Sequence, residues 1–183
     1  MPGAITLLTG PSRCGKTALC RELAREGTSL GRDIAGIISP ARFTNGHKVG
    51  IEAVDLRSGE TRTLATLQES ARSDPHQLGL WRFDEACFEW GNAVLRQAVP
   101  CDVLVVDELG PLEWEQGRGW LAGLEAVDSG DYERALVVVR PALVPRALSR
   151  WPRAETAQAS ELDACKQLMA SLRRAHSTRK APR

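Results

Sequence analysis

The stretch AITLLTGPSRCGKT, residues 4–17, decides the fold of this chain. Its first six residues form a short apolar run that Gly10 ends, which is typical of a buried strand at the centre of a parallel sheet. Residues 17–25 then have the spacing of an amphipathic helix that ends near Gly27. A strand, a glycine-containing turn and a helix in this order predict the start of an α/β domain.

The turn itself fits the pattern G-x-x-x-x-G-K-[ST] without deviation. The glycines let the backbone curl so that successive N–H groups point at a β-phosphate, and the helix adds the positive end of its dipole. We predict that the lysine reaches the β- and γ-phosphates and that the threonine hydroxyl binds Mg²⁺. A shuffled chain of this composition would carry about 0.003 such matches, so the motif predicts a nucleotide-binding P-loop (Walker A). Its residues are Gly10, Pro11, Ser12, Arg13, Cys14, Gly15, Lys16 and Thr17.

A second motif follows the clearest buried strand of the chain, the β-branched run 101–106. Asp107 and Glu108 come directly after this run, as in a Walker B strand, which we expect to neighbour the first strand. We predict that Asp107 helps to hold Mg²⁺ and that Glu108 is the general base that activates water. Glu113 fits two roles equally, a second active-site acid or a carboxylate at a helix N-terminus.

The rest of the chain predicts one P-loop domain over residues 1–176, followed by a disordered basic tail, 177–183. The pattern predicts further strands at 33–39, 78–83 and 135–139, and a surface loop at 68–75. Helices are expected at 84–97, 115–127 and 162–175, the first with Asp84 as its N-cap. The alternating stretches 48–56 and 61–66, joined by a Ser-Gly turn, predict an inserted β-hairpin. The fold class is therefore a three-layer α/β P-loop fold with a mostly parallel sheet.

Composition excludes several classes of protein. The 183 residues are 43% hydrophobic and 26% charged with a net charge of +1, so no overall field would attract nucleic acid or an anionic membrane. No apolar run reaches the length of a membrane-spanning helix, and the N-terminal residues lack the pattern of a signal peptide. The five cysteines show no CxxC pairing. We expect a reduced, cytoplasmic protein that binds neither nucleic acid nor membrane; the sequence names no protein partner.

Taken together, these motifs resemble the cancer-related nucleoside-triphosphatase family of small P-loop proteins. The resemblance covers roughly residues 4–140 and includes the P-loop, GIISP at 36–40, KVGI at 48–51 and DLRSGE at 55–60. Its most distinctive part is DELGPLE, residues 107–113. The resemblance implies a RecA-like core with a hairpin insertion and slow, Mg²⁺-dependent hydrolysis of ATP, GTP and other nucleoside triphosphates.

Two departures from the family bear on the rate or on contacts with the γ-phosphate. Many members carry acidic and arginine residues after the second strand, where this chain has SPARF at 39–43. Many also have a lysine where Pro111 stands. Arg13, Arg42 and Arg140 are candidates for a cis-acting arginine finger.

Two other functions fit the same motifs. A small-molecule or nucleotide kinase would transfer the phosphate to an acceptor, although residues 109–134 hold only two arginines for a lid. A nucleotide-binding switch protein would hydrolyse its ligand only incidentally. Phosphate release without an added acceptor distinguishes hydrolysis from the kinase reaction.

Overall fold

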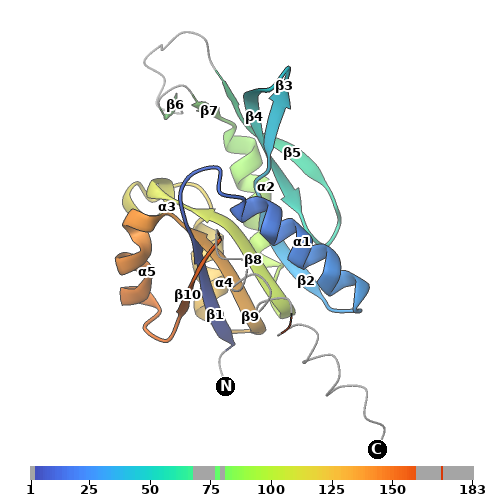
Figure 1. The fold of residues 1–183 in the computed structure, drawn as a ribbon, viewed down its shortest axis with the longest axis vertical. Helices are drawn as coiled ribbons and strands as arrows, with labels where there is room; N and C mark the ends of the chain where they lie inside the picture. Colours follow the sequence, from blue (N-terminus) through green and yellow to red (C-terminus); the bar gives the residue numbers. More distant parts are fainter. Residues whose placement is uncertain (1–2, 68–76, 79–80, 160–169, 171–183) are drawn as a thin grey trace, which may run out of the picture.

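The computed structural model describes residues 3–67, 77–78, 81–159 and 170 of the chain. These residues form one large sheet with helices on both of its faces (Figure 1). The strands are β1 (Ala4–Thr9), β2 (Ile34–Ile38), β3 (Ala41–Thr44), β4 (His47–Asp55), β5 (Thr61–Leu67), β6 (Gln77–Leu78), β7 (Trp81–Phe83), β8 (Cys101–Leu109), β9 (Tyr132–Val139) and β10 (Glu155–Gln158). The helices are α1 (Lys16–Ser29), α2 (Glu85–Arg96), α3 (Pro111–Glu115), α4 (Leu121–Ser129) and α5 (Val144–Arg150), with the short 3₁₀ turn η1 (Pro141–Leu143).

Five neighbouring strands, in the order β10-β1-β9-β8-β2, run parallel and form the core sheet. Their carboxyl ends therefore meet at one edge, the edge at which ligands of open α/β sheets bind. The expectation that the strand before Asp107 neighbours the first strand was wrong, because β9 lies between β1 and β8. The predicted α/β class, with its mostly parallel core, is confirmed.

Beyond β2 the sheet continues in antiparallel strands. β4 pairs with β2, β5 pairs with β4, and β7 pairs with β5. The predicted hairpin is therefore confirmed as β4–β5, and its turn lies at 57–60 as expected. The short strand β3, which was not predicted, pairs with β4 and projects away from the core sheet in Figure 1.

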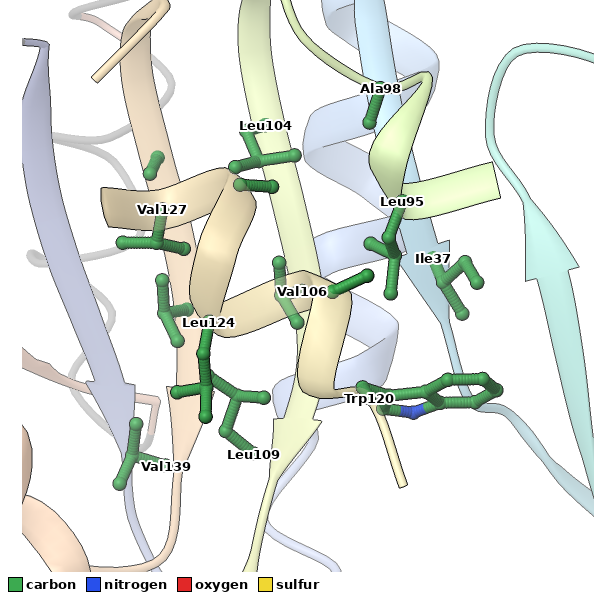
Figure 2. Close-up of a cluster of buried hydrophobic side chains, with 14 of the residues drawn as sticks. Ile37, Leu95, Ala98, Leu104, Val106, Leu109, Trp120, Leu124, Val127 and Val139 are labelled. Carbon is green, nitrogen blue, oxygen red and sulfur yellow. The ribbon is translucent and has the colours of Figure 1, made fainter. Parts of the chain in front are cut away.

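Two layers of helix cover the core sheet because its strands are apolar on both faces. On one face, Leu23 of α1 packs in a cluster with Leu8, Val105 and Val138. On the other face, α2 and α4 lie over β2, β8 and β9 (Figure 2). Every residue from Val103 to Val106 is fully buried. Continuous apolar runs such as this one are typical of parallel strands covered on both sides.

Several predicted elements differ in extent. The single helix expected over 115–127 is two helices, α3 and α4, because Gly117 and Gly119 between them adopt positive φ angles of 62° and 79°. β10 and α5 were not predicted. The predicted loop 68–75, the helix 162–175 and the tail 177–183 lie outside the described residues, apart from residue 170, which is helical. Within the described part of the chain, no helix is long and apolar enough to span a membrane.

Candidate nucleotide-binding and hydrolytic site

The P-loop connects the end of β1 to the start of α1, as the sequence predicted. Gly10, Arg13 and Gly15 have positive φ angles of 138°, 65° and 95°, a backbone that curls tightly over few residues. No side chain caps the N-terminus of α1, whose N-cap is Gly15. The first N–H groups of α1 and the dipole of the helix therefore favour an anion at this position.

The Lys16 ammonium lies over the loop. Its Nζ donates hydrogen bonds to the carbonyl oxygens of Gly10, at 2.9 Å, and Pro11, at 2.8 Å. The Sγ of Cys14 lies 3.8 Å from the same nitrogen. The positive charge of Lys16 is thus held beside the N–H groups that would bind a phosphate, as the P-loop motif requires.

Asp107 brings the Walker B strand to the P-loop. Its carboxylate is buried and accepts a hydrogen bond from the Ser39 N–H at 3.0 Å, and the Thr17 side chain lies beside it. Burial raises the pKa of Asp107 to about 6, although the Ser39 hydrogen bond, the Thr17 side chain and the charge of Lys16 lower it. Thr17 and Asp107 therefore lie together even though β9 separates β1, the strand before the P-loop, from β8.

The oxygens of Thr17 and Asp107 suit a magnesium ion. Mg²⁺ prefers oxygen ligands and is commonly held by one or two protein side chains together with water and substrate phosphates. The buried Asp107 carboxylate supplies a negative charge beside the hydroxyl oxygen of Thr17. Among the described residues no cluster of three or more His, Cys, Asp or Glu residues could hold a metal ion on its own.

Glu108, the residue after Asp107, forms an ion pair. Its Oε1 accepts a hydrogen bond from the Nε of Arg140 at 2.6 Å. Arg140 follows the end of β9, so the neighbouring parallel strands β8 and β9 bring the two side chains together. Arg140 is thus the one of the three arginine candidates with a direct contact to the predicted base.

Lys48 of β4 begins the KVGI stretch of the family resemblance, but we assigned it no role at the site from the sequence. Its ammonium lies 4.6 Å from the centre of the Trp81 ring. Burial lowers the pKa of Lys48, the charge of Glu108 raises it, and the charges of Arg13 and Arg140 lower it further. The charges of Glu108, Arg13 and Arg140 therefore all act on Lys48.

The sequence left two roles open for Glu113. In the structure, each of its carboxylate oxygens accepts a hydrogen bond from a backbone N–H. Oε2 accepts the N–H of Gly110 at 2.7 Å and Oε1 accepts the N–H of Trp120 at 2.8 Å. The first contact is one half of a capping box at the start of α3: the carboxylate at N3 accepts the N–H of the N-cap residue, and the N-cap glycine has no side chain to form the other half. Burial raises the pKa of Glu113 to about 7. These contacts are those of a carboxylate that holds the segment between α3 and α4 in place.

Arg42 and a cavity beside α2 do not belong to this group of contacts. The Arg42 guanidinium packs against Gly50 of β4, where an added Cβ would meet its Nε at 3.1 Å. A cavity of about 320 Å³ lies between α2 and the strands β2 and β4, and its walls include Gly36, Arg57 and Trp90. No P-loop residue lines it. We therefore assign the site from the motif side chains and not from this cavity.

The parallel strand order, the loop between β1 and α1, and the Thr17–Asp107 contact define a P-loop nucleotide-binding protein. A family model described as NTPase matches residues 5–146. The chain therefore belongs to this NTPase family.

Curated relatives support the assignment. The nucleoside-triphosphatase THEP1 of Thermococcus kodakarensis is 32% identical over 109 residues, which are 58% of this chain and 61% of that protein. The protein of the same name from Methanothermobacter thermautotrophicus is 30% identical over 108 residues, 58% of this chain and 60% of that protein. The chain thus matches about three fifths of the length of these relatives.

Two solved structures share the fold. A human cancer-related nucleoside triphosphatase aligns with a TM-score of 0.68 and 22% identity, over 98% of this chain and all of that chain. THEP1 from Aquifex aeolicus aligns with a TM-score of 0.63 and 14% identity, over 93% of this chain and 98% of that chain. At these identities the likeness concerns the fold alone.

Proposed function

We propose that this protein hydrolyses nucleoside triphosphates to nucleoside diphosphates and phosphate in a Mg²⁺-dependent reaction. One observation carries the proposal: the Thr17 side chain at the start of α1 lies beside the buried Asp107 carboxylate of β8 and lowers its pKa. This contact joins the phosphate-binding loop to the acidic strand end that contains Glu108. Membership of the NTPase family supports the same reaction.

The P-loop residues would bind and orient the triphosphate. The backbone N–H groups of the P-loop, which Pro11 lacks, would surround the β-phosphate. Lys16 would move from the carbonyl oxygens of Gly10 and Pro11 to the β- and γ-phosphates. Phosphoryl transfer depends mainly on positioning and on electrostatic stabilisation of the transferred group. We therefore assign most of the rate enhancement to this loop.

Thr17 and Asp107 would hold Mg²⁺ through their oxygens, Asp107 directly or through water. When bound, the ion neutralises negative charge on the β- and γ-phosphate oxygens. The role of Asp107 follows from its burial: a carboxylate whose pKa is raised to about 6 gains from a cation that replaces the water it has lost.

Glu108 would act as the general base. It would accept one proton from a water molecule while the water oxygen forms a bond to the γ-phosphorus and the bond from that phosphorus to the bridging β-oxygen breaks. The nucleoside diphosphate leaves with the electrons of the broken bond. Glu108 is suited to this role because, unlike Asp107, its carboxylate is about one-third exposed.

Steady-state phosphate release tests the proposal. Wild type and Lys16→Ala are incubated with ATP, GTP, CTP or UTP and Mg²⁺, with no acceptor added. We expect release from several nucleotides and a loss of 10²-fold or more in Lys16→Ala, about 3–4 kcal/mol of transition-state stabilisation. Arg25→Ala, on the exposed face of α1, is the control for loss of a positive charge.

The same assay separates the two other functions. Tight nucleotide binding without phosphate release would contradict hydrolysis and favour a kinase, which needs an acceptor, or a switch protein. A broad base preference, slow turnover and a cytoplasmic location remain part of the proposal. Neither nucleic acid nor membrane is proposed as a partner.

A further inference from the structure

The ion pair between Glu108 and Arg140 conflicts with the use of Glu108 as a base. Arg140 Nε donates to Glu108 Oε1 at 2.6 Å, and this contact occupies the carboxylate that has to accept a proton from water. The pair lies at the carboxyl edge of the core sheet, where β8 and β9 end side by side. About half of the Arg140 side chain and one-third of the Glu108 side chain are exposed.

Further charged groups lie around this pair. The charge of Glu108 raises the pKa of Lys48 on β4, and the charges of Arg140 and of Arg13 in the P-loop lower it. The other carboxylates that interact with Glu108 are those of Asp107 and Glu113, and both are buried. A further anion at the loop would therefore be attracted by Lys48 and Arg13 as well as by Arg140.

The terminal phosphate of a bound triphosphate would compete with Glu108 for Arg140. An exposed ion pair is weak because water screens both charges. A guanidinium binds phosphate more strongly, since it can donate two parallel hydrogen bonds to an anion that carries more charge than a carboxylate. A diphosphate lacks the terminal group and offers Arg140 no such partner.

We propose that Arg140 exchanges Glu108 for the terminal phosphate of a bound nucleoside triphosphate, and that this exchange frees Glu108 to receive the proton of the attacking water. Arg140 is then the residue that distinguishes triphosphate from diphosphate. This inference rests on the proposed function, because it requires a triphosphate in the P-loop.

A double-mutant cycle tests the exchange through measurements of nucleotide affinity. Affinities for a non-hydrolysable ATP analogue (β,γ-imido-ATP) and for ADP, both with Mg²⁺, are measured by calorimetry for wild type, Arg140→Ala, Glu108→Gln and the double variant. Arg140→Ala should weaken analogue binding about 10- to 100-fold and leave ADP binding within about twofold. Arg140→Lys should weaken analogue binding less than Arg140→Ala does, because lysine keeps the positive charge.

Glu108→Gln gives the sharper result. Removing the competing carboxylate should tighten analogue binding severalfold, and this gain should vanish when Arg140 is also replaced. The control is the Glu22–Arg25 pair on α1, which has the same 2.6 Å separation and whose matching substitutions should change neither affinity.

The outcomes separate the inference from the proposed function. Equal weakening of analogue and ADP in Arg140→Ala, or a Glu108→Gln gain that persists without Arg140, would overturn the exchange. If wild type binds neither nucleotide, or if Lys16→Ala binds both as well as wild type does, the proposed function itself fails.

Discussion

The two halves of the sheet are built on different principles. The parallel half, β10-β1-β9-β8-β2, is apolar and buried on both faces along its central strands. The antiparallel half, from β3 to β7, is more exposed: a few residues such as Ala53, Leu64 and Ala65 are buried, but every residue of β3 is exposed. The residues that require precise placement are Lys16, Asp107 and Glu108. All three lie in the parallel half, which helices cover on both faces.

The antiparallel half contributes to the site only from its margin. Lys48 of β4 reaches the group around Glu108 and rests on Trp81 of β7. This half thus adds charge to the mouth of the loop, whereas the parallel half positions the reacting groups.

The largest loss of stability is expected in the parallel half, where the backbones of β2 and β8 approach each other closely. Gly36 of β2 has a φ of +112°, and an added Cβ would lie 1.9 Å from the carbonyl oxygen of Val105. Gly36→Ala should lower the free energy of unfolding by about 4 kcal/mol or more, because backbone has to move in a close-packed sheet.

Gly59 in the β4–β5 turn is the matched control. Its φ of +74° also favours glycine, but an added Cβ meets nothing within 4 Å. Gly59→Ala should cost only about 1–2 kcal/mol, the cost of the left-handed conformation. Urea denaturation of both variants measures the difference, and equal losses would contradict the contrast.

The next effect concerns pH and the segment after β8. Burial raises the pKa of Glu113 from 4.5 to about 7, so the folded state holds this proton more tightly than the unfolded state does. The stability that Glu113 contributes through this proton is fully present below pH 4.5 and is lost as pH rises through about 7. Relative to Glu113→Gln, wild type should therefore lose up to about 3 kcal/mol of stability between pH 4.5 and 8. Thermal unfolding across this range measures it, and a constant difference would contradict the account.

A smaller effect is expected at α2, the helix that packs against both halves. The Asp84 carboxylate accepts the N–H of Ala86 at 2.9 Å, the N-cap contact that the sequence predicted. Asp84→Ala should lower the free energy of unfolding by about 1 kcal/mol. Asp84→Asn, which keeps an acceptor, should lose much less; the same loss in both variants would argue against the cap.

The smallest effect is expected on β3. Phe43 is 57% exposed, so its replacement removes little buried surface. Phe43→Ser should change the free energy of unfolding by less than about 0.5 kcal/mol. A loss above 1 kcal/mol, measured by urea denaturation, would show that the antiparallel half depends on Phe43 for packing.

Short-range signals in the sequence predicted the elements that carry the site. The P-loop motif, the buried run before Asp107 and the Asp84 cap are each encoded by neighbouring residues, and each element is found in the structure. β3 and β10 were missed because their sequences, ARFT and ETAQ, carry little apolar pattern and become strands only by pairing with β4 and β1.

Tertiary packing alone decides the remaining features. The order of strands, with β9 between β1 and β8, follows from crossovers that no local pattern records. The Glu108–Arg140 pair and the position of Lys48 depend on strands far apart in the sequence. Glu113 was ambiguous because an acid after a buried strand suits both roles, and only its two backbone contacts distinguish them.

The most direct test of the account compares the two glutamates of this edge. Phosphate release at saturating ATP and Mg²⁺ is measured for Glu108→Gln and Glu113→Gln, together with nucleotide binding, at a temperature where both variants are folded. The account predicts that Glu108→Gln binds nucleotide but loses 10²-fold or more in rate, while Glu113→Gln stays within about threefold of wild type. Retained hydrolysis in Glu108→Gln, with the loss in Glu113→Gln instead, would contradict it.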